Sequence, residues 1–223
     1  MNRIVIINIW LLGVISFAQP NCFIYPEGSG EREACELSYK AIEYPQGSRA
    51  SQELFDEAIA IGPKYAWAYY EKSVPYFKRG FLNKGLQILN KAIELEPREY
   101  LCYRAYWYWQ YKNYALCIAD LESYYKLPKA YLQQTPGGDK DMRLILGLAY
   151  AKQGELQKAI FLFNKAINFN SDLAAAYVSL GVIFYKQGKE KESRKFLLTA
   201  ASLFKKQGLL KEAENIQQFY QNQ

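Results

Sequence analysis

The chain has 223 residues, of which 50% are apolar and 22% are charged, a composition that fits one globular domain and argues against disorder. It contains no histidine, which excludes Ser-His and Cys-His nucleophile pairs, HExxH zinc sites and imidazole proton shuttles. The formal net charge is +6, and 20 Tyr, 12 Phe and 4 Trp must either fill a core or face a partner.

Residues 1–18 have the pattern of a cleaved secretory signal peptide. An apolar run extends from Ile4 to Ala18, and Ser16 and Ala18 place small residues where a signal peptidase reads the chain. The run is shorter than the roughly 20 apolar residues that a membrane-spanning helix needs. We therefore expect an exported protein, periplasmic or secreted, whose mature form begins at Gln19.

Residues 19–31 are predicted to form an irregular N-terminal segment. Four cysteines allow three pairings, and we favour a disulfide between Cys22 and Cys35 because it ties this segment to the first predicted helix. Such a loop stabilises a fold by roughly 3 kcal/mol. The alternative is a set of free, buried thiols that pack as small hydrophobes. No CxxC motif is present, which argues against a zinc site, and we expect no metal and no cofactor.

The C-terminal half contains a repeat of 34 residues. The segment Leu146-Gly147-Leu148-Ala149-Tyr150 recurs as Leu180-Gly181-Val182-Ile183-Phe184 at this offset. Two amphipathic helices within 34 residues are typical of a helical solenoid. The segment 140–173 is similar to the tetratricopeptide repeat family, which has Leu-Gly at repeat positions 7 and 8, Tyr at 11, and Ala, Phe and Ala at 20, 24 and 27. The matching residues are Leu146, Gly147, Tyr150, Ala159, Phe163 and Ala166.

This resemblance implies an all-α, right-handed superhelical solenoid of about five helix-turn-helix repeats with a C-terminal capping helix. The repeats are assigned to residues 32–65, 66–97, 98–133, 140–173 and 174–207, and the capping helix to residues 208–223. Pro63 and Pro97 are expected to close helices, and Pro75 is expected to kink one. In the third repeat we place Ala105, rather than Trp107, at the small position 8 because a Trp does not fit a close helix contact. The run 135–138 is predicted to protrude as a loop.

In this family the first helices of successive repeats line a concave groove. The resemblance therefore implies a partner-binding groove, which we assign to Trp67, Tyr70, Phe77, Lys78, Tyr106, Trp109, Lys152, Tyr185 and Lys186. Eighteen of the 36 aromatic residues lie between Tyr65 and Tyr131, and aromatic anchors in a concavity are typical of peptide-binding hot spots. The alternative is that these rings form the core, and for Tyr69, Tyr76 and Tyr108 we adopt it.

Residues 174–207 carry seven basic and two acidic side chains, which predicts contact with an acidic partner or an anionic membrane surface. The alternative is a solvated helix face with mixed Lys-Glu pairs. Two Ser-x-x-Lys matches lack the partner motifs of serine acyl enzymes. We therefore expect no catalysis and no nucleic-acid binding, but a protein- or peptide-binding scaffold in the cell envelope that uses the aromatic groove. The alternative function is a small-ligand or saccharide-binding protein, or an accessory enzyme, that uses the same groove.

Overall fold

The computed structural model describes residues 21–127 and 141–221, which contain one short 3-10 helix, η1 (Cys22–Ile24), and eleven α-helices. The predicted signal peptide and the predicted loop at 135–138 lie outside these residues. Within the described ranges, none of the helices combines the length and the apolar character needed to cross a membrane.

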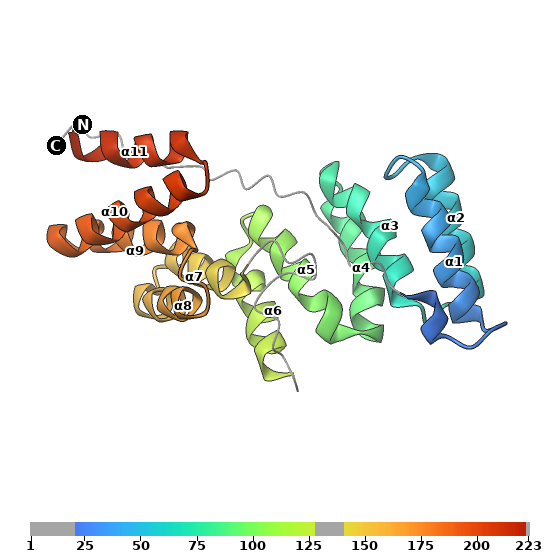
Figure 1. The fold of residues 1–223 in the computed structure, drawn as a ribbon. Helices are drawn as coiled ribbons and strands as arrows, with labels where there is room; N and C mark the ends of the chain where they lie inside the picture. Colours follow the sequence, from blue (N-terminus) through green and yellow to red (C-terminus); the bar gives the residue numbers. More distant parts are fainter. Residues whose placement is uncertain (1–20, 128–140, 222–223) are drawn as a thin grey trace.

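Ten of these helices pair in chain order as five helical hairpins, each joined by a short turn (Figure 1). The eleventh helix, α11 (Leu210–Gln221), packs on the second helix of the last hairpin. The fold is therefore the predicted all-α solenoid with a C-terminal capping helix. The hairpins are α1 (Gly30–Glu43) with α2 (Arg49–Ile61), α3 (Ala66–Lys78) with α4 (Leu82–Leu95), α5 (Pro97–Gln110) with α6 (Tyr114–Lys126), α7 (Met142–Lys152) with α8 (Leu156–Phe169), and α9 (Ala174–Lys186) with α10 (Glu190–Lys206).

The helix contacts show which side of the stack is the inner one. The first helices of neighbouring hairpins touch one another, α1 with α3, α5 with α7 and α7 with α9. Within the described chain, the second helices contact their own hairpin partner and the first helix of the next hairpin, but make no comparable contact with one another. Because the hairpins approach more closely through their first helices, the stack curves toward that side. The first helices therefore line the inner surface, and the second helices form the outer one.

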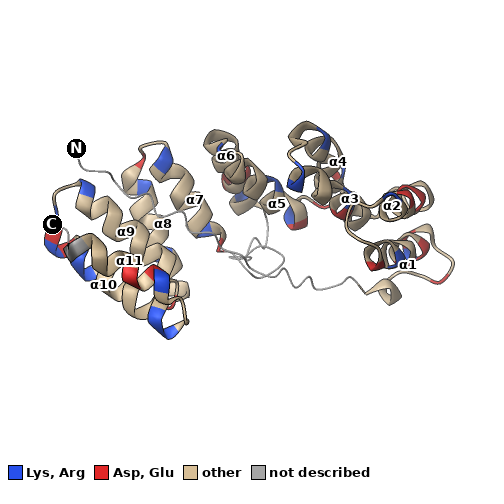
Figure 2. Cartoon of the chain, turned by 90° about the horizontal axis from the view of Figure 1, so that it is seen from above, with Lys and Arg blue, Asp and Glu red and all other residues tan. Residues whose placement is uncertain are grey.

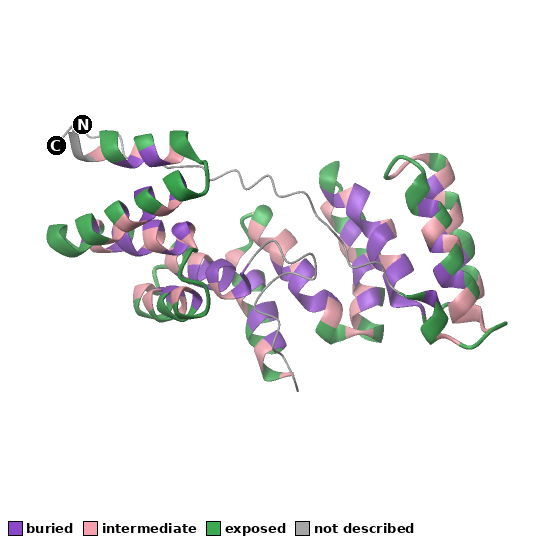
Figure 3. Ribbon diagram, viewed as in Figure 1, coloured by how far each residue is buried: buried purple, intermediate pink, exposed green. Residues whose placement is uncertain are grey.

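Small residues allow the two helices of a hairpin to approach closely. A Cβ atom added to Gly147 would lie 2.7 Å from Cε1 of Phe163, and one added to Gly181 would lie 2.4 Å from Cγ of Leu197. Both neighbouring side chains are buried, and buried residues follow the helix contacts along the whole stack (Figure 3). The two glycines are therefore required by packing, as the repeat pattern predicts.

The turn inside the third hairpin differs from the others. The second, fourth and fifth hairpins turn through Gly80, Gly154 and Gly188, whose φ angles of 86°, 84° and 71° place them in the left-handed region. The third hairpin turns through Lys112 with φ of 60°, which is the one non-glycine residue with positive φ in the described ranges. A side chain in this region is strained, so the third repeat departs from the family pattern in its turn as well as in its helices.

Several predicted boundaries need correction. The first helix begins at Gly30, two residues before the assigned repeat, because Ser29 caps it by accepting a hydrogen bond from the amide of Arg32 at 3.2 Å. Pro97 opens α5 rather than closing the preceding helix, in the first turn where its missing N–H costs no hydrogen bond. Pro75, by contrast, lies inside α3 as predicted, because the helix continues to Lys78, and this proline removes one backbone donor from it.

The packing of the third hairpin agrees with the preferred register. Ala105, Cys117 and Leu121 are each fully buried, and all three belong to one core cluster of the middle hairpins. Trp107 is half-buried and packs instead against the core of the first two hairpins. The small residue at the close α5–α6 contact is therefore Ala105, not Trp107.

Candidate partner-binding surface

Aromatic rings fill the space between α3 and α5. The ring of Tyr70 lies 5.3 Å from that of Tyr100 and 4.2 Å from that of Tyr103, measured between centroids. The ring of Phe77 stacks on that of Trp107 at 4.7 Å with an interplanar angle of 10°. These rings join the second hairpin to the third, which accounts for much of the aromatic density in the middle of the chain.

Tyr70 and Phe77 are consequently buried, at 3% and 2% exposure, rather than open to the groove as the repeat register predicts. For Phe77 the cause is Gly85 of α4, where an added Cβ would lie 2.9 Å from the ring. The space left by this glycine admits the phenyl ring into the hairpin core. The neighbouring hydroxyl of Tyr111 also donates a hydrogen bond to the carbonyl oxygen of Phe77 at 2.8 Å.

Trp67 is also buried, at 8% exposure. Its ring lies 5.9 Å from that of Tyr39 in α1 and 6.3 Å from that of Tyr65, the residue that precedes α3. Burial raises the pKa of the Tyr65 hydroxyl well above its usual value, so this phenol stays protonated. The Trp67 ring therefore takes part in packing between the first two hairpins.

Glu71 is a buried carboxylic acid on the same helix, with 4% exposure. Burial raises its pKa from 4.5 to about 7, and the charge of Lys78 opposes this rise. Lys78 itself is exposed, and its ammonium group donates a hydrogen bond to Oε1 of Gln46 at 2.6 Å. Of the predicted groove residues on α3, Lys78 alone is therefore exposed.

The inner helices of the C-terminal half keep more of their predicted residues accessible. Lys152 of α7 and Lys186 of α9 are exposed, and Val182 of α9 is 38% exposed. Tyr185 is half-buried, with its ring 5.0 Å from that of Phe219 in the capping helix. Val182 was not assigned to the groove from the sequence, although its position one turn before Lys186 on α9 could have indicated it.

Tyr106 and Trp109 lie on α5, the inner helix that follows α3 and precedes α7 in the stack. Both are half-buried, and the ring of Trp109 lies 5.2 Å from that of Tyr114 at the start of α6. Each of them therefore offers part of its ring to solvent while the rest packs against the core. We use the name C-terminal inner surface for the predicted and added residues of these three helices, which are Tyr106, Trp109, Lys152, Val182, Tyr185 and Lys186.

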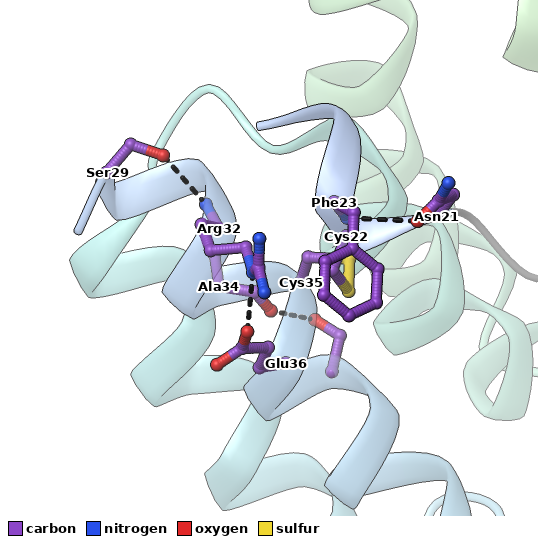
Figure 4. The surroundings of a disulfide bond; sticks show 9 residues. Asn21, Cys22, Phe23, Ser29, Arg32, Ala34, Cys35 and Glu36 are labelled. Carbon is purple, nitrogen blue, oxygen red and sulfur yellow. Dashed lines mark hydrogen bonds and ion pairs between the residues drawn. A yellow bond between two sulfur atoms is a disulfide. The ribbon is translucent and has the colours of Figure 1, made fainter. Parts of the chain in front are cut away.

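A disulfide anchors the N-terminal segment, with an S–S distance of 1.99 Å between Cys22 and Cys35 (Figure 4). This is the pairing favoured from the sequence. Arg32 lies beside the bridge, with its guanidinium carbon 4.3 Å from the centroid of the Phe23 ring and its Nε donating to Glu36 at 2.5 Å. The bridge therefore fixes η1 against α1 at the N-terminal end of the stack.

The remaining cysteines are poor candidates for chemistry. Cys102 and Cys117 are free and buried at 2% and 0% exposure. Burial raises the pKa of both thiols, that of Cys117 to about 12, so they stay protonated and weakly nucleophilic at neutral pH. In the ranges that the structure describes, no group of three or more His, Cys, Asp or Glu side chains is arranged to hold a metal ion.

Two family models match the C-terminal half of the chain. A model described as TPR repeat matches residues 147–188, and one described as tetratricopeptide repeat matches residues 174–207. A TPR repeat-containing protein of Methanocaldococcus jannaschii is 28% identical over 120 residues. The match covers 50% of this chain and 18% of that protein, so the chain spans less than a fifth of its length.

Solved structures with the same arrangement of helices include two titled MamA and one titled for pilF of Pseudomonas aeruginosa. A MamA crystal structure is 20% identical, with a TM-score of 0.60, and the match covers 71% of this chain and 90% of that one. The MamA structure from Desulfovibrio magneticus RS-1 is 17% identical, with a TM-score of 0.65 and coverage of 82% and 99%. The pilF structure is 16% identical, with a TM-score of 0.63 and coverage of 84% and 90%. At these identities the likeness concerns the fold alone.

Proposed function

Because the chain is a tetratricopeptide-repeat protein, we propose that it is a non-enzymatic scaffold that binds a protein or peptide partner on the C-terminal inner surface. The observation that carries this proposal is the exposure of Val182, 38% open on an inner helix, with Lys186 exposed one turn away. An accessible apolar side chain beside half-buried aromatic rings is a composition suited to the core of a protein interface, and the exposed lysines are suited to its polar rim.

The surface we propose is shorter than the groove predicted from the sequence. Tyr70 and Phe77 make ring contacts with α5, and Trp67 packs against Tyr39. These three rings therefore pack between neighbouring hairpins and are not available to a partner. The binding role of Tyr106 and Trp109 remains part of the proposal, because each keeps part of its ring accessible. The same ring packing weighs against a saccharide or small-ligand site, which needs open aromatic faces.

We also place this scaffold in the cell envelope, as an exported protein. The apolar run from Ile4 to Ala18 supports this location. The disulfide between Cys22 and Cys35 supports it independently, because such bonds persist in oxidising compartments and are rare in reducing ones. Intact-mass measurement on protein from the native host tests the export step, since cleavage after Ala18 leaves Gln19 at the N-terminus.

A pair of matched variants tests the binding surface. The partner is captured from the envelope fraction with the purified chain, and its affinity for Val182→Glu is compared with its affinity for Leu116→Glu. Leu116 is 43% exposed on α6, an outer helix, so both changes place a carboxylate at an accessible apolar position. We expect Val182→Glu to weaken binding by about 2 kcal/mol, the scale of an interface hot spot, and Leu116→Glu to leave it unchanged. Equal affinities for the two variants would refute the inner surface as the binding site.

A further inference from the structure

The outer helix α10 presents a basic face along its whole length. Seven exposed positions make up this face, which are Lys191, Arg194, Lys195, Leu198, Ser202, Lys205 and Lys206. Two further exposed residues of the first turn, Glu190 and Glu192, are acidic. Residues three or four apart lie on one side of a helix, so the seven positions form one continuous face. Glu190 and Glu192 are next to Lys191 in the sequence and so lie about 100° to either side of it, at the edges of this face. Lys191 and Lys205 are about 21 Å apart along the axis at 1.5 Å per residue.

Most of the charge on this face is not neutralised within the protein. Lys206 pairs with Asp172 at 2.9 Å. No ion pair in the described ranges engages Lys191, Lys195 or Lys205. Figure 2 shows Lys and Arg gathered on the helices at the C-terminal end of the stack. The face therefore carries a positive electrostatic potential that attracts a negatively charged partner.

The preceding outer helix, α8, continues this pattern. Its exposed positions include no acidic residue and are Gln157, Lys158, Phe161, Asn164, Lys165, Asn168 and Phe169. Lys158 pairs with Glu155, the residue before the helix, at 3.5 Å. Phe161 is 58% exposed on α8, and Leu198 is 48% exposed in the middle of the basic face of α10. Phe169, at the C-terminal end of α8, is 54% exposed. Each of these outer helices thus combines lysines with at least one large apolar side chain that is exposed to water.

The outer helix at the other end of the molecule has the opposite character. The exposed positions of α2 include Glu53, Asp56 and Glu57, with Arg49 as the accompanying base. The outer surface therefore changes from acidic at the N-terminal hairpin to basic at the last two hairpins. Such a gradient orients the molecule in an electric field and presents the C-terminal end to a negative surface.

From these features we propose that the outer faces of α8 and α10 dock on an anionic lipid bilayer. Lysines are compact point charges that suit a diffuse negative surface, whereas paired recognition of protein carboxylates favours the arginine fork, and this face has one Arg among its cations. Phe161 and Leu198 then enter the boundary between headgroups and acyl chains, as the apolar side chains of interfacial helices do. The inner surface stays free for a partner, so this inference does not depend on the proposed scaffold function.

Vesicle flotation with matched charge variants tests the electrostatic part. The chain is mixed with phosphatidylcholine vesicles, with and without phosphatidylglycerol. One triple variant removes charge from the face (Lys191→Gln, Lys195→Gln and Lys205→Gln), and a second removes the same charge from exposed positions in the N-terminal half (Lys40→Gln, Lys64→Gln and Lys84→Gln). Each Lys near an anionic surface contributes roughly a factor of five, so the face variant should lose binding to anionic vesicles on the order of 100-fold. The N-terminal variant should bind like the parent.

A fluorescent probe attached to the basic face of α10 tests membrane insertion at that face directly. Cys102 and Cys117 are buried and the other two cysteines are paired, so a polarity-sensitive fluorophore labels Leu198→Cys selectively. We expect its emission to shift to the blue on anionic vesicles, and the same label on Lys84→Cys to stay unshifted. The proposal is overturned if the label at position 198 does not shift, if both triple variants bind equally, or if an acidic polypeptide such as polyglutamate binds the face while vesicles do not.

Discussion

Replacing Gly181 by alanine separates two effects that act in opposite directions on the contact between α9 and α10. In a helix interior, alanine is more favourable than glycine by about 1 kcal/mol. Here the new Cβ would lie 2.4 Å from Cγ and 2.7 Å from Cδ2 of Leu197, a side chain that is 3% exposed and cannot move into solvent. Overpacking of this kind costs about 1 to 3 kcal/mol. We therefore expect Gly181→Ala to leave stability unchanged or to lower it by up to about 2 kcal/mol, the difference between the two terms.

A double-mutant cycle measures the packing term directly. In a Leu197→Ala background the clashing atoms are gone, so the same Gly181→Ala change should stabilise the protein by up to about 1 kcal/mol through helix propensity. The coupling between the two sites is then about 1 to 3 kcal/mol, as expected for residues in contact. Equilibrium urea unfolding of the parent, both single variants and the double variant provides the four free energies. If Gly181→Ala has the same effect in both backgrounds, the close helix contact does not exist.

Three further changes probe other features of the fold by urea unfolding. Lys112→Gly should raise the free energy of unfolding by about 0.5 to 1 kcal/mol, because it removes a side chain from the left-handed region at φ of 60°, and a loss of stability would contradict the assigned turn. Replacing both Cys22 and Cys35 by alanine should lower it by about 3 kcal/mol, the entropy effect of a loop with a separation of 13 residues, and should abolish any response to reductant; a variant that still responds would show that this bridge is not the stabilising one. Because burial raises the pKa of Glu71 from 4.5 to about 7, the folded state holds a proton that the unfolded state releases, so stability falls as pH rises from about 4.5 to about 7. Glu71→Gln should remove this part of the pH dependence, and equal slopes for parent and variant between these pH values would disprove it.

The sequence was sufficient wherever the family pattern is carried by packing within one hairpin. Gly147 and Gly181 are one repeat period apart. At each position a side chain of the paired helix, Phe163 or Leu197, occupies the space that a Cβ atom would need. A contact that every repeat makes in the same way leaves the same residue type at the same spacing. The solenoid and the capping helix could therefore be predicted from residue spacing together with the family resemblance. The register of the middle hairpin needed a further argument from side-chain size, which placed Ala105 rather than Trp107 at the close contact.

The candidate surface was harder to predict because it depends on contacts between hairpins. Whether a ring at a groove position is open or buried depends on what the neighbouring repeat offers, and Tyr70 meets two tyrosines of α5 there. Phe77 turns inward because Gly85, on a different helix, leaves room for it. The signal existed in the sequence, since Gly85 occupies a position where the fourth repeat has Ala159. Reading it requires the three-dimensional relation of two helices, which periodicity does not supply.

Site-specific photo-crosslinking tests the central proposal, binding at the C-terminal inner surface, most directly. A photoreactive amino acid is placed at Lys152 or Lys186 on the inner helices, and at Lys84 or Lys158 on the outer ones, all of which are exposed. After capture of the partner, irradiation should give a covalent partner adduct at the two inner positions and none at the two outer positions. Adducts at the outer positions alone would contradict the account and would move the binding surface to the second helices of the repeats.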